Sequence, residues 1–130
     1  QKKNSMDQEE YLESANNRFE YIVDDIISES SADKRMERIL EIATDVEVIP
    51  DVGRYYTFVY APKTPRIQYD QNPLIACVEV QRWGFKGLNY HWGEVRNYTW
   101  NEVIGQLHVI YPMELTDLRS IPYQYIRINN

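Results

Sequence analysis

The 130-residue sequence contains a single cysteine, Cys77, which excludes an intrachain disulfide and gives no sign of an oxidising compartment. No apolar run approaches the roughly 20 residues that a membrane-spanning helix needs, and the first residues lack the basic and then apolar pattern of a signal peptide. We therefore expect a protein that has no membrane partner and is soluble and intracellular when it is made.

Residue types that carry catalytic or metal chemistry are also scarce. His91 and His108 are the only histidines, and His91 with Glu94 has no known metal-ligand spacing. Cys77 lies in an apolar run without a basic neighbour to lower its thiol pKa, so we expect it to pack as a small hydrophobic residue. A thiol hydrolase built on Cys77 and a metal site at His91 are alternatives that this pattern disfavours. The sequence predicts no enzyme, no metal site and no cofactor.

Charge and aromatic residues are unevenly distributed along the chain. Residues 1–50 carry 13 acidic and 6 basic residues, whereas residues 51–130 carry 7 acidic and 8 basic ones. Tyr11, Phe19 and Tyr21 are the only aromatic residues before position 51, and the other 14 follow it. We interpret this division as an acidic helical arm, residues 1–45, in front of an aromatic-rich β-domain, residues 46–130.

The arm has the periodicity of an amphipathic helix. Between Ser5 and Ser28, apolar residues recur three or four positions apart and form one stripe, and Ser5 with Gln8 offers a capping box. The stripe consists of Leu12, Ala15, Phe19, Ile22 and Ile26. Its breadth favours packing on the chain's own core, with a self-association seam as the alternative. A second helix through Met36 and Ala43 would complete a helical hairpin.

The second part of the chain shows short strand patterns separated by turn signals. Strands are expected at 46–49, 54–60, 74–80, 88–92 and 123–128. The segment Trp83–Gly87 is expected to be a bend or bulge, and Thr99 with Glu102 predicts a short helix that ends near His108. The expected fold is α+β: the helical hairpin, then a small, strongly bent antiparallel β-barrel of the SH3-like or OB-like kind with one short helix.

The β-domain is also expected to carry the contact surface, because aromatic side chains and a stiff Pro62–Pro65 loop are concentrated there. For contact with another protein subunit or a second copy, the candidates are Leu12, Phe19, Ile22, Ile26, Lys63, Trp83, Phe85 and Trp92. The alternative partner is single-stranded DNA or RNA, for which the candidates are Arg82, Lys86, Tyr90 and Arg96. The net charge of −6 weakens that alternative, because counterion release drives such binding. His91 is expected to be half-buried and bonded to the backbone.

Four short segments of the β-domain stand out together. They are Tyr55–Tyr60, Pro62–Pro65, Tyr69-Asp70 with Asn72-Pro73-Leu74, and Gly84–Trp92, which contains a Gly-Phe-x-Gly-x-Asn-x-His element. This combination resembles a group of small proteins of tailed bacteriophages, notably those of marine and cyanobacterial hosts. The resemblance covers about residues 54–128 and carries over no activity or catalytic residue. It implies a phage origin and a place in the virion, at the neck, tail, baseplate or capsid, after assembly in the host cytoplasm. We therefore expect a non-enzymatic assembly or docking module.

Overall fold

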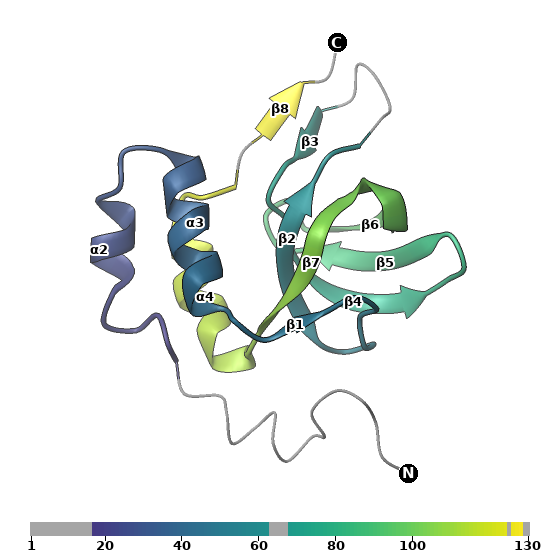
Figure 1. Ribbon diagram of the computed structural model, residues 1–130, viewed down its shortest axis with the longest axis horizontal. Helices are drawn as coiled ribbons and strands as arrows, with labels where there is room; N and C mark the ends of the chain where they lie inside the picture. Colours follow the sequence, from purple (N-terminus) through teal and green to yellow (C-terminus); the bar gives the residue numbers. More distant parts are fainter. Residues whose placement is uncertain (1–16, 63–67, 125, 129–130) are drawn as a thin grey trace.

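The computed structural model describes residues 17–62, 68–124 and 126–128, and it has an α+β fold. Six antiparallel strands form one sheet in the order β1-β7-β2-β4-β5-β6, and two further strands, β3 and β8, form a separate ribbon (Figure 1). The strands of the large sheet are β1 (Val46–Glu47), β2 (Tyr55–Tyr60), β4 (Leu74–Val80), β5 (Gly84–Asn89), β6 (Glu94–Thr99) and β7 (Val103–Ile110). The ribbon pairs β3 (Gln68–Asp70) with β8 (Ile126–Ile128).

Short helices lie together on one side of the sheet (Figure 1). They are α2 (Val23–Ile27), α3 (Ala32–Ile42) and α4 (Leu115–Ser120), with the 3-10 turn η2 (Pro112–Glu114) before α4. A second 3-10 turn, η1 (Trp100–Glu102), connects β6 to β7. The Ser31 hydroxyl caps α3 by accepting a hydrogen bond from the backbone N–H of Lys34, at 3.2 Å. Met36 and Ile39 of α3 are buried, so one face of this helix packs on the core.

The long first helix predicted for Ser5–Ser28 is wrong in the described part of the chain. Arg18–Ile22 forms turns, and only Val23–Ile27 is helical. The Asn17 side-chain oxygen accepts a hydrogen bond from the backbone N–H of Phe19 at 2.9 Å, a local contact that competes with helix formation. Leu12 and Ala15 lie outside the described residues. The helical hairpin is therefore not confirmed in its predicted form.

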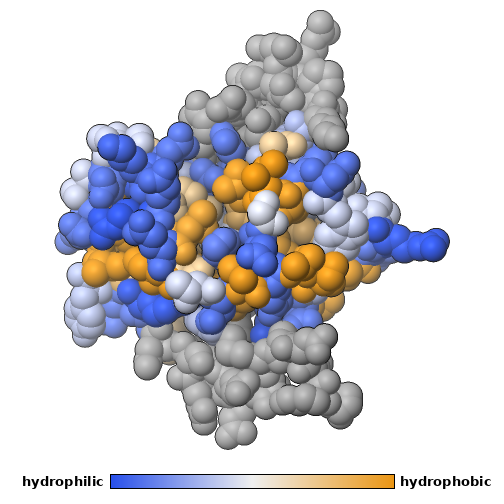
Figure 2. Space-filling view, in the orientation of Figure 1, coloured by the Kyte–Doolittle hydropathy of each residue, from blue (hydrophilic) through white to orange (hydrophobic). Residues whose placement is uncertain are grey.

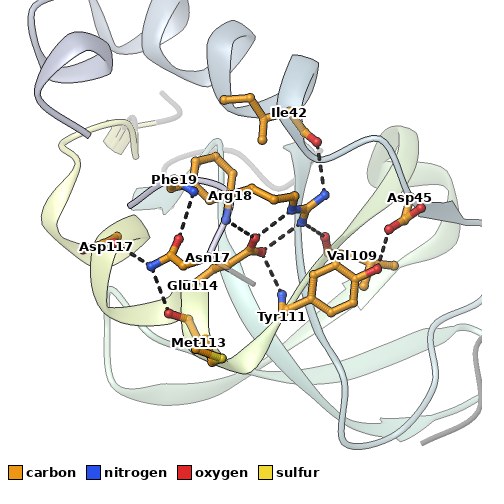
Figure 3. A network of polar contacts seen from close by, with 10 residues as sticks. All are labelled: Asn17, Arg18, Phe19, Ile42, Asp45, Val109, Tyr111, Met113, Glu114 and Asp117. Carbon is orange, nitrogen blue, oxygen red and sulfur yellow. Dashed lines mark hydrogen bonds and ion pairs between the residues drawn. The ribbon is translucent and has the colours of Figure 1, made fainter. Parts of the chain in front are cut away.

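A network around Arg18 explains why the chain departs from a helix here (Figure 3). Its guanidinium donates to the buried carboxylate of Glu114 through Nε at 2.7 Å and Nη2 at 2.9 Å, and to the carbonyl oxygens of Ile42 and Val109. The backbone N–H of Arg18 also donates to Glu114, at 3.0 Å. These contacts attach the segment before α2 to η2, which lies almost 100 residues later in the chain.

Two predictions about the β-domain also need correction. The predicted helix after Thr99 is only the turn η1, and Val103–Ile110 continues as strand β7, because β-branched residues pair with β2 and Gly105 has a left-handed φ of 82°. The bend or bulge predicted at Trp83–Gly87 is confirmed only in part: Trp83 lies in the bend before β5, whereas Gly84–Gly87 belong to strand β5, opposite a register shift in β4 between Cys77 and Glu79. The strands predicted at 54–60 and 74–80 are confirmed as β2 and β4.

Two hydrophobic clusters hold the molecule together. The first is aromatic and lies inside the bend of the sheet, where the Phe58 ring meets Phe85 at 5.8 Å and Tyr98 at 5.4 Å between centroids. The second joins the helices to the opposite face of the sheet through Phe19, Ile26, Met36, Ile39, Ala43, Leu74, Ile110, Leu118, Ile121 and Tyr123. The favoured prediction that the arm's stripe packs on the chain's own core is thus confirmed for Phe19 and Ile26. The division into an arm and a β-domain stays a prediction.

The sheet is bent but not closed. Its outer strands, β1 and β6, have no strand partner on their outer sides among the described residues. Because a barrel requires its first and last strands to pair, the predicted small, strongly bent barrel is not confirmed.

Candidate protein-contact site

The residues predicted to contact another protein fall into several environments. Phe19, Ile26 and Phe85 are fully buried, so their side chains are not exposed at the surface of this fold. Ile22 is half-buried against the helical cluster. Trp83 is exposed, whereas Trp92 is half-buried. Leu12 and Lys63 lie outside the described residues.

The residues predicted to contact nucleic acid are mostly engaged with the protein itself. Arg96 pairs with Glu94 at 2.7 Å and its guanidinium lies 4.1 Å from the centre of the Trp92 ring. Lys86 lies 3.9 Å from Glu79. The half-buried ring of Tyr90 packs on Tyr55, and Arg82 is exposed at the turn between β4 and β5. These positions therefore do not form an open stacking platform flanked by free cations.

His91 forms the most conspicuous polar contact of the β-domain. The residue is half-buried as predicted, but its Nδ1 lies 3.0 Å from the buried Asp70 carboxylate, so the predicted backbone partner of the ring is wrong. The Asn89 side-chain oxygen accepts hydrogen bonds from the backbone N–H groups of His91 and Trp92. The other ring nitrogen, Nε2, is buried and has no hydrogen-bond partner among the described residues. Without a hydroxyl or thiol at Nε2, this pair lacks the nucleophile that a histidine-based hydrolase needs.

Cys77 is equally unsuited to catalysis. Its side chain is buried in the aromatic cluster, which confirms its prediction as a small core residue. Burial raises the pKa of the Cys77 thiol to about 11, so the reactive thiolate is scarce near neutral pH. Among the described residues, no three side chains of histidine, cysteine, aspartate or glutamate come close enough together to hold a metal ion.

An apolar pocket opens where β1 leaves β7. The two strands pair only through Val46 with His108 and Glu47 with Leu107, after which the chain turns toward Pro50. Strand β7 is itself distorted at this level. Thr57 pairs with His108 and Val59 pairs with Ile104. Between these two pairs β7 spans four residues, whereas β2 spans only two. The two extra residues form a bulge at Gly105, which leaves a hollow between β7 and the tail of β1.

The pocket has a volume of about 120 Å³ and a mainly apolar lining. It is lined by Val48, Ile49, Phe85, Trp100, Val103, Gly105 and Leu107. Val48 is 68% exposed and Ile49 56% exposed, and nearby Ile104 on β7 is 53% exposed. Figure 2 shows several hydrophobic areas on the face that carries β1 and β7, separated by hydrophilic residues. Large aliphatic side chains thus remain in contact with water around a hollow that is itself apolar.

Sequence reasoning did not identify this pocket, although part of the signal was visible. The alternation of Val46, Val48 and Ile49 before Pro50 predicted a short strand here. The other wall was missed because Val103 and Leu107 were assigned to a helix, which hid the bulge at Gly105.

Comparison with known proteins gives no further guide to this site. No protein-family model, curated protein sequence or solved structure shows significant similarity to the chain. The resemblance to small tailed-phage proteins therefore stays a prediction. In the described part of the chain, no helix is both long and apolar enough to cross a membrane.

Proposed function

We propose that this chain is a non-enzymatic docking module that binds another protein by taking one of its apolar side chains into the β1–β7 pocket. The observation that carries the proposal is the exposure of Val48 and Ile49 at the rim of an apolar hollow. Exposed aliphatic residues grouped around a pocket are typical of interaction sites, and interface hot spots cluster where a side chain fills such a pocket.

The size and lining of the pocket favour a protein side chain over a cofactor or metabolite. Small-molecule sites usually enclose about 300–1,000 Å³ and contain a few directed polar groups. This pocket, at about 120 Å³, is smaller and is lined by apolar residues and Gly105. One aliphatic or aromatic side chain, presented by an extended segment beside β7, would match both features.

The proposed setting is the virion of a tailed phage, as one component of its neck, tail, baseplate or capsid. The four segments that resemble small phage proteins are what support it, and an absence of catalytic geometry in the described residues is compatible with it. The aromatic cluster shared by β2, β5, β6 and β7 also supports a description of the sheet as an opened SH3-like or OB-like barrel.

The docking proposal is tested by selecting binders from a random 12-residue peptide library displayed on a carrier particle, with the full chain as bait. We expect enriched peptides to share one large apolar residue. Val48→Asp and Ile49→Asp should each weaken their binding at least about tenfold, because a charge at the rim would have to be desolvated. Val52→Asp is the matched control, since Val52 is also exposed but does not line the pocket.

The proposal is rejected if selection yields no binders, or if the selected peptides bind the Ile49→Asp and Val52→Asp variants equally well. Circular dichroism and thermal unfolding of each variant show whether the fold is retained before binding is compared.

A further inference from the structure

Strand β6 ends the sheet with an open backbone edge. Within the described chain it pairs only with β5, from Gly84 opposite Thr99 to Asn89 opposite Glu94. Its exposed side chains include Val95 and Asn97, and Val95 is 53% exposed. β6 carries no proline or lysine, which are residues that often block such edges.

The hydrogen-bonding pattern identifies which residues face this edge. The backbone N–H of Trp100 donates to the carbonyl of Trp83 at 3.2 Å, so residue 100 belongs to a hydrogen-bonded pair with β5. In an antiparallel ladder such pairs alternate with residues whose N–H and C=O point the other way. The backbone groups of Val95, Asn97 and Thr99 therefore point away from β5.

We propose that the β6 edge is a self-association site, at which β6 pairs antiparallel with β6 of a second copy. In the proposed arrangement, Asn97 lies opposite Asn97 of the other copy, and Val95 lies opposite Thr99. All three outward-facing residues of each strand then join the ladder and form about six hydrogen bonds between the copies. The interface is isologous, as a twofold dimer requires.

The side chains of β6 disfavour the registers that shift the pairing toward its N-terminal end. A shift of two residues would place Arg96 opposite Arg96, and like charges directly opposite each other are destabilising. A shift of two more residues would place Val95 opposite Val95 and Asn97 opposite Gly93. Gly93 has a φ of 75° and lies in the turn before β6, so it cannot continue the strand ladder. In the proposed register no charged residue faces a like charge, and two β-branched side chains, Val95 and Thr99, meet across the interface.

A single introduced cysteine tests both the dimer and its register. Residues in a directly opposed hydrogen-bonded pair have Cα atoms about 5.5 Å apart, within the range of a disulfide. Asn97→Cys should therefore form a disulfide-linked dimer on mild oxidation. Val95→Cys is the matched control, because in this register the two copies of Val95 are offset by four residues, about 13 Å. The wild-type chain is the control for disulfides formed through Cys77, which is buried.

The non-covalent dimer is measured by sedimentation equilibrium on the full chain. Asn97→Pro removes an N–H that faces the edge and leaves the bonds to β5 in place, so the dimer should weaken about tenfold or more. Asn97→Lys, which puts two ammonium groups opposite each other, gives a second variant if proline disturbs the strand. Thr116→Lys on α4 adds the same charge at another exposed position and should leave the dimer unchanged.

A wild-type chain that stays monomeric at all concentrations overturns the proposal, and so does crosslinking through Val95→Cys in place of Asn97→Cys. This inference rests on the β6 edge alone. Self-association can fail while peptide binding at the β1–β7 pocket still depends on Ile49, and the reverse can also occur. The two experiments therefore separate the two proposals.

Discussion

Removal of the Arg18 side chain should destabilise the protein far more than loss of an ordinary surface ion pair. The Glu114 carboxylate is fully buried and accepts two hydrogen bonds from the Arg18 guanidinium, at 2.7 and 2.9 Å (Figure 3). In Arg18→Ala, the described residues would leave that charge two backbone N–H groups, those of residue 18 and Tyr111. The carboxylate would thus lose two of its four described hydrogen bonds.

The magnitude follows from the burial of the two groups. Breaking a buried ion pair by removing one partner typically costs 3–5 kcal/mol, and exposed pairs are worth about 0–1 kcal/mol. Since Arg18 is 23% exposed and Glu114 is not exposed at all, the lower end of the buried range applies. We expect the free energy of unfolding to fall by about 3 kcal/mol in Arg18→Ala.

The assay is urea unfolding followed by tryptophan fluorescence, with the slope of the transition checked for two-state behaviour. Arg82→Ala, an exposed arginine, is the control and should change stability by less than about 0.5 kcal/mol. The double variant Arg18→Met with Glu114→Gln should be more stable than Arg18→Met alone, because a neutral amide leaves no unpaired charge. A loss below about 1 kcal/mol in Arg18→Ala would refute the reasoning, since it would place the contact among surface pairs.

Three further predictions concern the β-domain. Gly84→Ala should destabilise the chain by about 2 kcal/mol or more in the same urea assay, because a Cβ would lie 2.0 Å from the Tyr98 carbonyl oxygen; full stability would show that β5 and β6 are further apart. Burial raises the pKa of Cys77 to about 11, so at pH 9 the folded thiol should react with a thiol reagent at least about fiftyfold more slowly than the thiol of the urea-unfolded chain; equal rates would contradict its burial. Lys86→Ala and Arg96→Ala should not change retention of a single-stranded oligonucleotide, because both cations already have carboxylate neighbours; a salt-dependent loss of binding would revive the nucleic-acid alternative.

Local sequence patterns were sufficient to locate the strands and the helix whose structure depends on neighbouring residues. β2 combines aromatic and β-branched residues, and β4 is an apolar run, so both could be located from the sequence. The same holds for α3, whose Ser31 cap and buried Met36 and Ile39 follow helical spacing.

Long-range contacts decided the segments that were misassigned. Phe19, Ile22 and Ile26 fit one helical stripe, but Arg18 is held by Glu114, and the chain bends to satisfy that contact. The spacing of Val103 and Leu107 fits a helix, whereas pairing with β2 makes them part of a strand. A sequence window of a dozen residues contains neither partner, which is why propensity alone failed there.

Asp70 and His91 illustrate the same limit at the level of side chains. They are 21 residues apart, and their contact depends on β4 and β5 pairing in the observed register. Both lie in segments that contribute to the phage-like resemblance, but nothing in the sequence states that those segments meet. The contact could be found only from the folded chain.

Both proposed contact surfaces arise because the sheet does not close. Pro50, which has no N–H to donate, follows soon after β1, and the bulge at Gly105 turns β7 away, so the β1 ladder stops after two residues and leaves a pocket. At the other end, β6 has no strand partner in the described chain, whereas closure would have removed both edges. The aromatic run that dominates the sequence instead supplies interior rings such as Phe85. The contacts available to the sheet are therefore set by where its closure fails, and the rings of the aromatic run that are buried fill its interior.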